Sequence, residues 1–199
     1  MKKLFLLLFA AITTATFAQD KINIESGNFD FLKDQTEVNV QFKFENPLFQ
    51  ADNYTEAQYL ERRKTETLAK KGEQSWKEWD EEWQKHKESV FFDKFIEGVN
   101  GKAKKIKFTK GASAKYTLIL HTKWIYAGWT GFVIQPAKLS SEMIFVETEN
   151  PSKVLTKVQG DKIEGIGSKG SYRMEYGRIS AAYEKTGKEL GKAIKNALK

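Results

Sequence analysis

The chain has 199 residues, a formal net charge of +7 and no cysteine. This length accommodates one domain with a full hydrophobic core, and the lack of cysteine excludes disulfides, thiol nucleophiles and thiolate metal sites. The basic excess is mild and is not gathered in an arm or a tail.

The first 18 residues have the pattern of a secretory signal peptide. Two lysines form a basic head, an apolar stretch covers 4–12, and Thr16-Phe17-Ala18 offers small residues at both cleavage positions. The apolar stretch is too short for a membrane-spanning helix, which needs about 20 residues. We expect cleavage before Gln19 and a periplasmic or secreted protein. A lipid anchor is not expected, because no cysteine follows the apolar stretch.

Export narrows the partners that we expect. Nucleic acid is not expected as a partner of an exported protein. Loss of Lys2 and Lys3 leaves a charge of about +5, which suits a weak attraction to anionic envelope polymers or lipid head groups. No motif implies a cofactor.

The N-terminal part of residues 19–199 changes from strands to helix. Alternating apolar residues predict strands at 22–24 and 38–44. Beyond Pro47, Thr55 and Gln58 have the spacing of a capping box, and a charged segment continues to Lys71. This segment predicts an exposed polar helix that ends before Gly72.

A second predicted helix carries a stripe of large apolar residues. Ser75 and Glu78 repeat the capping pattern, and Gly98 or Gly101 is expected to end the helix. The stripe follows spacings of three, four and seven: Trp76, Trp79, Trp83, Val90, Phe91 and Phe95. We expect it to pack onto the sheet, so that 54–100 form a helical insertion within one domain.

From Ile106 onward the apolar period is two. It predicts a meander of antiparallel strands with a turn at 128–131, the strands covering 106–108, 116–126, 132–134, 143–146 and 154–158. The segment 171–198 predicts an amphipathic helix, in which Gly187 and Gly191 indicate that another element approaches the backbone. Together the elements predict an α+β fold of two layers: a largely antiparallel sheet covered by the helical insertion and the C-terminal helix.

Several motifs suggest catalysis but lack the necessary context. Residues 165–170 match the dinucleotide fingerprint G-x-G-x-x-G, yet no strand follows the next helix, which favours a hinge. His86 and His121 have no acidic neighbours at ligand spacing, so no metal site is expected. Asp161 and Glu164 could serve as acid and base, but a facing pair is not apparent from the sequence. No catalytic residue is predicted.

Two surfaces are candidates for binding. Trp129 and Phe132 lie near a hairpin turn, where exposed rings stack on sugars or bind a partner protein, and core packing is an equal alternative. Lys188, Lys192 and Lys195 recur on one side of the terminal helix. They suit an anionic surface, although a solvated outer face is the favoured interpretation.

Four segments resemble uncharacterised exported proteins of Bacteroidota: Thr-Phe-Ala before Gln19, the strands 116–126 and 141–148, and the ending Ala182-Tyr183-Glu184-Lys185-Thr186-Gly187-Lys188-Glu189-Leu190-Gly191-Lys192. The layout is also similar to small α+β domains of envelope components, such as the periplasmic domain of the curli secretion channel and the N-terminal domain of the Tol translocation protein. The charged segment 54–71 and the missing lipid anchor depart from that layout. The resemblance implies protein partners and no catalytic residue.

Composition, motifs and resemblance together predict a non-catalytic exported binding module of the cell envelope. Its partner is expected to be a protein or an envelope polymer. A glycan- or lipid-binding periplasmic protein is the alternative, and a hydrolase is the least favoured function.

Overall fold

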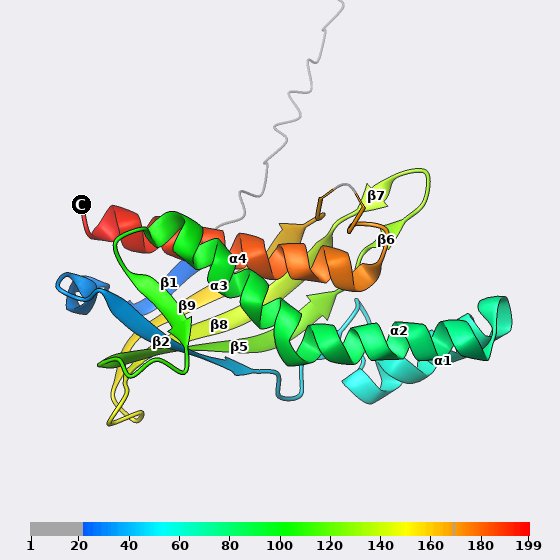
Figure 1. The fold of residues 1–199 in the computed structure, drawn as a ribbon, viewed down its shortest axis with the longest axis horizontal. Helices are drawn as coiled ribbons and strands as arrows, with labels where there is room; N and C mark the ends of the chain where they lie inside the picture. Colours follow the sequence, from blue (N-terminus) through cyan, green and yellow to red (C-terminus); the bar gives the residue numbers. More distant parts are fainter. Residues whose placement is uncertain (1–21, 169) are drawn as a thin grey trace, which may run out of the picture.

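The computed structural model describes residues 22–168 and 170–199. The predicted signal peptide at 1–18 and Lys169 of the glycine-rich motif lie outside the described residues. The main sheet has seven strands in the order β1-β9-β8-β5-β2-β4, with β3 paired to β5, and helices α3 and α4 lie over one of its faces (Figure 1). This arrangement confirms the α+β class.

One half of the sheet is antiparallel and contains three of the five strands predicted for the meander; the segments predicted at 106–108 and 132–134 do not belong to this half. Strand β5 (Tyr116–Tyr126) pairs with β8 (Ala137–Glu147), β8 pairs with β9 (Val154–Gly165), and β9 pairs with β1 (Ile22–Gly27). The long strands β8 and β9 extend well past their predicted bounds. A short 3₁₀ helix, η1 (Asp30–Leu32), follows β1.

The other half of the sheet is parallel. Strand β2 (Glu37–Lys43) runs parallel to both β4 (Lys107–Lys110) and β5, and β3 (Leu48–Phe49) runs parallel to β5. Parallel neighbours need a long crossover connection, and the helical insertion between β3 and β4 supplies one. The sheet is therefore mixed and not largely antiparallel. The sequence does not predict the parallel half, because the period of two that identifies strands carries no information on their direction.

The two capping boxes predicted for the insertion have different outcomes. Helix α1 (Glu56–Lys71) begins after Thr55, whose N–H donates to Gln58 Oε1 at 2.9 Å and whose Oγ1 accepts from Gln58 N at 3.3 Å. Helix α2 (Glu73–Lys85) begins two residues before the predicted Ser75, without a side-chain cap. Gly72 has a φ of 83°, and this left-handed residue separates the two helices.

The helix predicted to end at Gly98 or Gly101 continues to Ala103. Helix α2 leads through a π-helical segment, η2 (His86–Val90), into α3 (Phe91–Ala103). Gly98 serves close helix packing instead, because a Cβ there would overlap Glu184 O of α4 (Glu175–Ala197). Gly187 and Gly191 of α4 face the α3 backbone in the same way, which confirms the approach that these glycines predicted.

The stripe of aromatic residues belongs to the core, as expected. Trp79, Trp83, Phe91 and Phe95 are buried, and Trp76 packs against them from a partly buried position. The ring of Tyr183 in α4 stacks on Phe91 with centroids 5.0 Å apart. The first half of the insertion does not cover the sheet, because α1 and α2 project beyond its end (Figure 1).

Two further predictions are wrong: the turn after β5 and the first residue of α4. The expected turn at 128–131 contains strand β6 (Trp129–Thr130), which pairs with β7 (Ile134–Gln135) in a separate small hairpin. Helix α4 begins at Glu175 instead of 171, since residues 171–173 fold back against it. Gly177 permits this, because a Cβ there would overlap Ser171 O.

Candidate functional site

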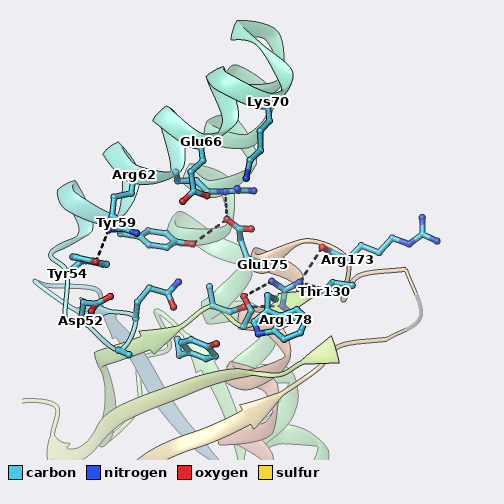
Figure 2. A pocket seen from close by; sticks show the side chains of 17 residues that line it. Asp52, Tyr54, Tyr59, Arg62, Glu66, Lys70, Thr130, Arg173, Glu175 and Arg178 are labelled. Carbon is cyan, nitrogen blue, oxygen red and sulfur yellow. Dashed lines mark hydrogen bonds and ion pairs between the residues drawn. The ribbon is translucent and has the colours of Figure 1, made fainter. Parts of the chain in front are cut away.

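A cavity of about 670 Å³ opens where α1 projects past the end of the sheet. Its walls are α1, the loop between β3 and α1, the segment 126–130 and the start of α4 (Figure 2). Five cationic side chains line it against three carboxylates: Arg62, Arg63, Lys70, Arg173 and Arg178 against Asp52, Glu66 and Glu175. The cavity therefore has a surplus of positive charge and suits an anionic ligand.

Arg178 joins the segments that form one side of this cavity. Its side chain is buried, with only 2% of the residue exposed. Nε donates to Ala127 O at 3.0 Å and Nη2 to Gly128 O at 3.1 Å, while Nη1 donates to Thr130 Oγ1 at 2.9 Å and Tyr172 O at 2.6 Å. These acceptors are neutral oxygens, so the hydrogen bonds fix the guanidinium without neutralising its charge.

The charge of Arg178 persists despite burial. Burial lowers the pKa of Arg178 below its ordinary value, and the nearby Glu175 carboxylate opposes that change. An arginine in a protein keeps its proton even so. The cavity wall consequently carries a permanent and positioned positive charge.

Glu175, Arg63 and Tyr59 form a connected group between the start of α4 and α1. Arg63 Nε lies 2.6 Å from Glu175 Oε1, and Tyr59 OH donates to the same oxygen at 3.3 Å. Burial raises the pKa of Tyr59 well above its ordinary value of 10, and the Glu175 carboxylate raises it further. Tyr59 therefore remains a hydrogen-bond donor, and Glu175 forms an ion pair with Arg63 while its charge also favours the nearby Arg178.

Arg62 is held over the cavity by Tyr54. Its guanidinium lies 4.7 Å from the centroid of the Tyr54 ring, and Nη1 donates to Tyr54 OH at 2.8 Å. A hydrogen bond with Asp52 raises the pKa of the Tyr54 hydroxyl. The side chain of Arg62 is thus ordered at the entrance while its residue stays exposed (Figure 2).

The structure separates the two aromatic residues predicted for binding. Trp129 is 47% exposed and lines the cavity. Phe132 is fully exposed at the turn between β6 and β7 and does not line it. Both side chains lie outside the core, so of the two alternatives for these residues, core packing and surface exposure, the structure shows surface exposure.

The lysines predicted on α4 lie away from this cavity. Lys188 forms an ion pair with Glu184, and Lys192 Nζ lies 2.7 Å from Glu189 Oε1. Lys195 is exposed near the end of α4. Such exposed pairs contribute little to stability, and they mask part of the positive face.

The residues considered for catalysis or metal binding have separate partners. His86 Nδ1 contacts Glu82 O at 2.7 Å, whereas His121 Nε2 lies 3.5 Å from Glu45 O. Asp161 accepts from Ser140 Oγ at 2.8 Å, and Glu164 pairs with Lys138. Among residues 22–168 and 170–199, no group of three or more His, Asp or Glu side chains could hold a metal ion.

Sequence reasoning missed most of the cavity. Arg178 had no clear signal, because on the predicted helix it falls outside the stripe of Ile179, Tyr183 and Leu190 and nearer to the lysines. Arg62 and Tyr59 had no signal either, since the α1 segment is charged on most sides.

In the described part of the chain, no helix has the length and apolar character needed to cross a bilayer. Comparison of the chain with protein-family models, with curated proteins and with solved structures finds no match.

Proposed function

We propose that this protein is an exported, non-catalytic binding module of the cell envelope that binds an anionic glycan in the cavity beside α1. The observation that carries the proposal is the surplus of cations around that cavity, with Arg178 fixed by neutral acceptors. Arg178 contributes its charge from a buried position, whereas Arg62 and Arg173 are exposed at the cavity and are the arginines that can donate to a carboxylate directly.

Aromatic residues favour a sugar over a simple anion. Tyr54, Tyr126 and Trp129 line the same cavity as the cations. A ring of this kind offers a large apolar face with a polar edge, which suits the alternating apolar and hydroxyl surfaces of a sugar. The combination supports an acidic sugar, whose carboxylate would meet the arginines while its ring meets an aromatic face.

The test is a calorimetric titration of the purified protein with galacturonic acid and with neutral galactose. We expect saturable binding of the acid alone, weakened by added salt. Arg62→Gln combined with Lys70→Gln should weaken binding about tenfold or more, because each removes a charge from the cavity. The matched control, Lys64→Gln with Lys77→Gln, changes net charge equally on exposed positions outside the cavity. Equal losses in both variants would contradict the assignment.

The export part of the proposal rests on residues 1–18 and has its own test. The full chain, expressed in a Gram-negative bacterium, should appear in the periplasmic or external fraction with Gln19 as its first residue. N-terminal sequencing measures this directly. Recovery of an uncleaved chain in the cytoplasm would overturn the export proposal while leaving the cavity proposal intact.

A protein partner is the second candidate, favoured by the hairpin β6–β7. Phe132 is fully exposed, and Val133 beside it is 61% exposed. Exposed neighbouring apolar side chains are typical of interaction sites. Cross-linking in cells should capture one recurrent protein with the wild-type chain and lose it with Phe132→Ser. Retention of that partner by the variant would exclude the hairpin as the contact.

A further inference from the structure

A second cavity lies on the face of the sheet opposite α3 and α4. Its volume is about 710 Å³, and it is lined by residues of β5, β7, β8 and β9 and of the loop before α1: Ala51, Asn53, Trp124, Tyr126, Gln135, Lys138, Ser140, Asp161 and Lys162. Trp124 and Tyr126 alternate along β5 with Ile125, which is fully buried on the helix side. The aromatic pair is therefore displayed on the side of the sheet that these helices leave uncovered.

The two cavities adjoin each other. Ala51 and Tyr126 line both, so Tyr126 lies between the cationic cavity beside α1 and the cavity on the sheet. A ligand longer than one sugar could occupy both without crossing another element. Short ligands would reach only one.

The aromatic pair is fixed in orientation. The rings of Trp124 and Tyr126 are parallel within 11°, with centroids 6.3 Å apart. Trp124 Nε1 donates to Gln50 O at 2.9 Å, which holds the indole in place. Lys162 Nζ lies 5.8 Å from the centroid of the Trp124 ring, so a positive charge accompanies the aromatic pair.

Fixed polar groups accompany this pair. Ser140 Oγ donates to Asp161 Oδ1 at 2.8 Å and accepts from Lys162 N at 3.0 Å. Lys162 has a φ of 48° and lies at the bulge where the pairing of β9 with β8 shifts in register. The second cavity thus presents both acceptors and donors beside an aromatic surface, the combination that recognises hydroxyl groups of a sugar chain.

We infer that the ligand is a linear acidic polysaccharide that runs from the cationic cavity across Tyr126 onto the Trp124 side of the sheet. This inference rests on the proposed function, since it extends the same site. One acidic unit binds among the arginines, and the following units stack on Tyr126 and Trp124 and hydrogen-bond to the Ser140–Asp161 group. Affinity should consequently increase with the length of the chain.

The experiment is calorimetric titration with galacturonic acid and its linear trimer and hexamer. We expect the hexamer to bind about tenfold tighter than the monomer, since stacking and hydrogen bonds add to the carboxylate contact. Trp124→Leu should weaken hexamer binding on the order of tenfold and leave monomer binding unchanged. Lys162→Ala provides a milder test at an exposed position, with Lys157→Ala, another β9 lysine outside the cavity, as its matched control.

The outcomes separate this inference from the proposed function. Binding of the monomer with no gain for longer chains would overturn the inference and leave the cationic cavity as the site. Absence of binding for every acidic sugar would overturn both. If Trp124→Leu fails to fold, as judged by circular dichroism, the decision rests on the length series together with Lys162→Ala. A length gain that Lys162→Ala reduces and Lys157→Ala preserves supports the path.

Discussion

At the scale of single residues, Arg178 connects parts of the chain that are distant in sequence. It binds carbonyls of the segment 127–128 and of the turn at 172–173, and it also binds the Thr130 hydroxyl in β6. Its planar group presents five N–H donors in fixed directions, which a lysine lacks. One residue thereby sets the positions of Trp129 and of the start of α4 relative to the cavity.

We predict that Arg178→Lys lowers the free energy of unfolding by about 1–3 kcal/mol, because several buried carbonyls lose their donor. Denaturant titration measures the loss. Lysine keeps the positive charge at position 178 but not the set of guanidinium hydrogen bonds. A stability equal to that of the wild type would therefore show that these hydrogen bonds are dispensable.

His86 gives a prediction for pH. Burial lowers the pKa of His86 from its ordinary value of 6.5, although Glu82 partly opposes the effect. The unfolded chain therefore binds a proton more readily than the folded protein as the pH falls through 6.5. Stability contributed by neutral His86 is present above 6.5, is lost as the pH falls from there, and reaches its minimum contribution below the folded pKa.

His86→Gln should consequently lose less stability than the wild type over this acidic interval. Denaturant midpoints measured in a pH series for both proteins provide the comparison. Parallel curves throughout the series would show that His86 does not link protonation to folding.

At the scale of elements, the N-terminus of α1 allows the contribution of a capping box to stability to be measured. Thr55 and Gln58 satisfy two backbone donors through the reciprocal capping box. We predict that Thr55→Ala costs about 1 kcal/mol of stability. Thr65→Ala, an exposed change within the same helix, should be neutral or slightly stabilising because alanine is the better helix former. Thermal unfolding of the two variants decides, and equal behaviour would contradict a role for the cap.

Two glycine-to-alanine substitutions in α3 and α4 should have opposite effects on stability. Gly187→Ala should destabilise the protein by about 1–3 kcal/mol, because its Cβ would overlap Phe95 O. Gly101→Ala in α3 meets nothing within 4 Å and should stabilise by up to about 1 kcal/mol. Chemical denaturation of both variants tests the assignment of these two glycines.

These elements also show what the sequence could predict. The capping pattern at Thr55 and Gln58 located the start of α1 to the residue, whereas the same pattern at Ser75 and Glu78 did not mark the start of α2. The glycines of α4 correctly indicated a close neighbour, but Gly98 was interpreted as a helix end. A glycine that permits helix contact and one that ends a helix are identical in sequence, and only the position of the partner helix distinguishes them.

At the scale of the whole molecule, a single hydrophobic core links the elements. Tyr183 of α4 contacts Phe91 of α3, and its hydroxyl shares a 2.6 Å hydrogen bond with Thr122 of β5. We predict one cooperative unfolding transition, with coincident curves from tryptophan fluorescence and far-ultraviolet circular dichroism. Two separated transitions would instead indicate that α1 and α2 unfold as an independent unit.

The sequence predicted the class of this molecule better than its candidate site. Local periodicity is sufficient to identify strands and helices, and their order then indicates an α+β fold. The cavity beside α1 depends on how α1, the segment 126–130 and α4 meet, which no local pattern encodes. Trp129 was found because aromatic residues cluster around it, whereas Arg62 was one charged residue among many.

The pairing of β1 with β9 has a consequence for how the chain folds. Ile22 lies opposite Gly160, so the first strand described has its partner near the end of the sequence. A chain that emerges progressively from its N-terminus, from a ribosome or from a translocation channel, leaves β1 unpaired until β9 has followed. Contacts of such sequence separation slow folding. This topology should therefore leave the edge of β9 and the strand β1 as the last part of the sheet to form.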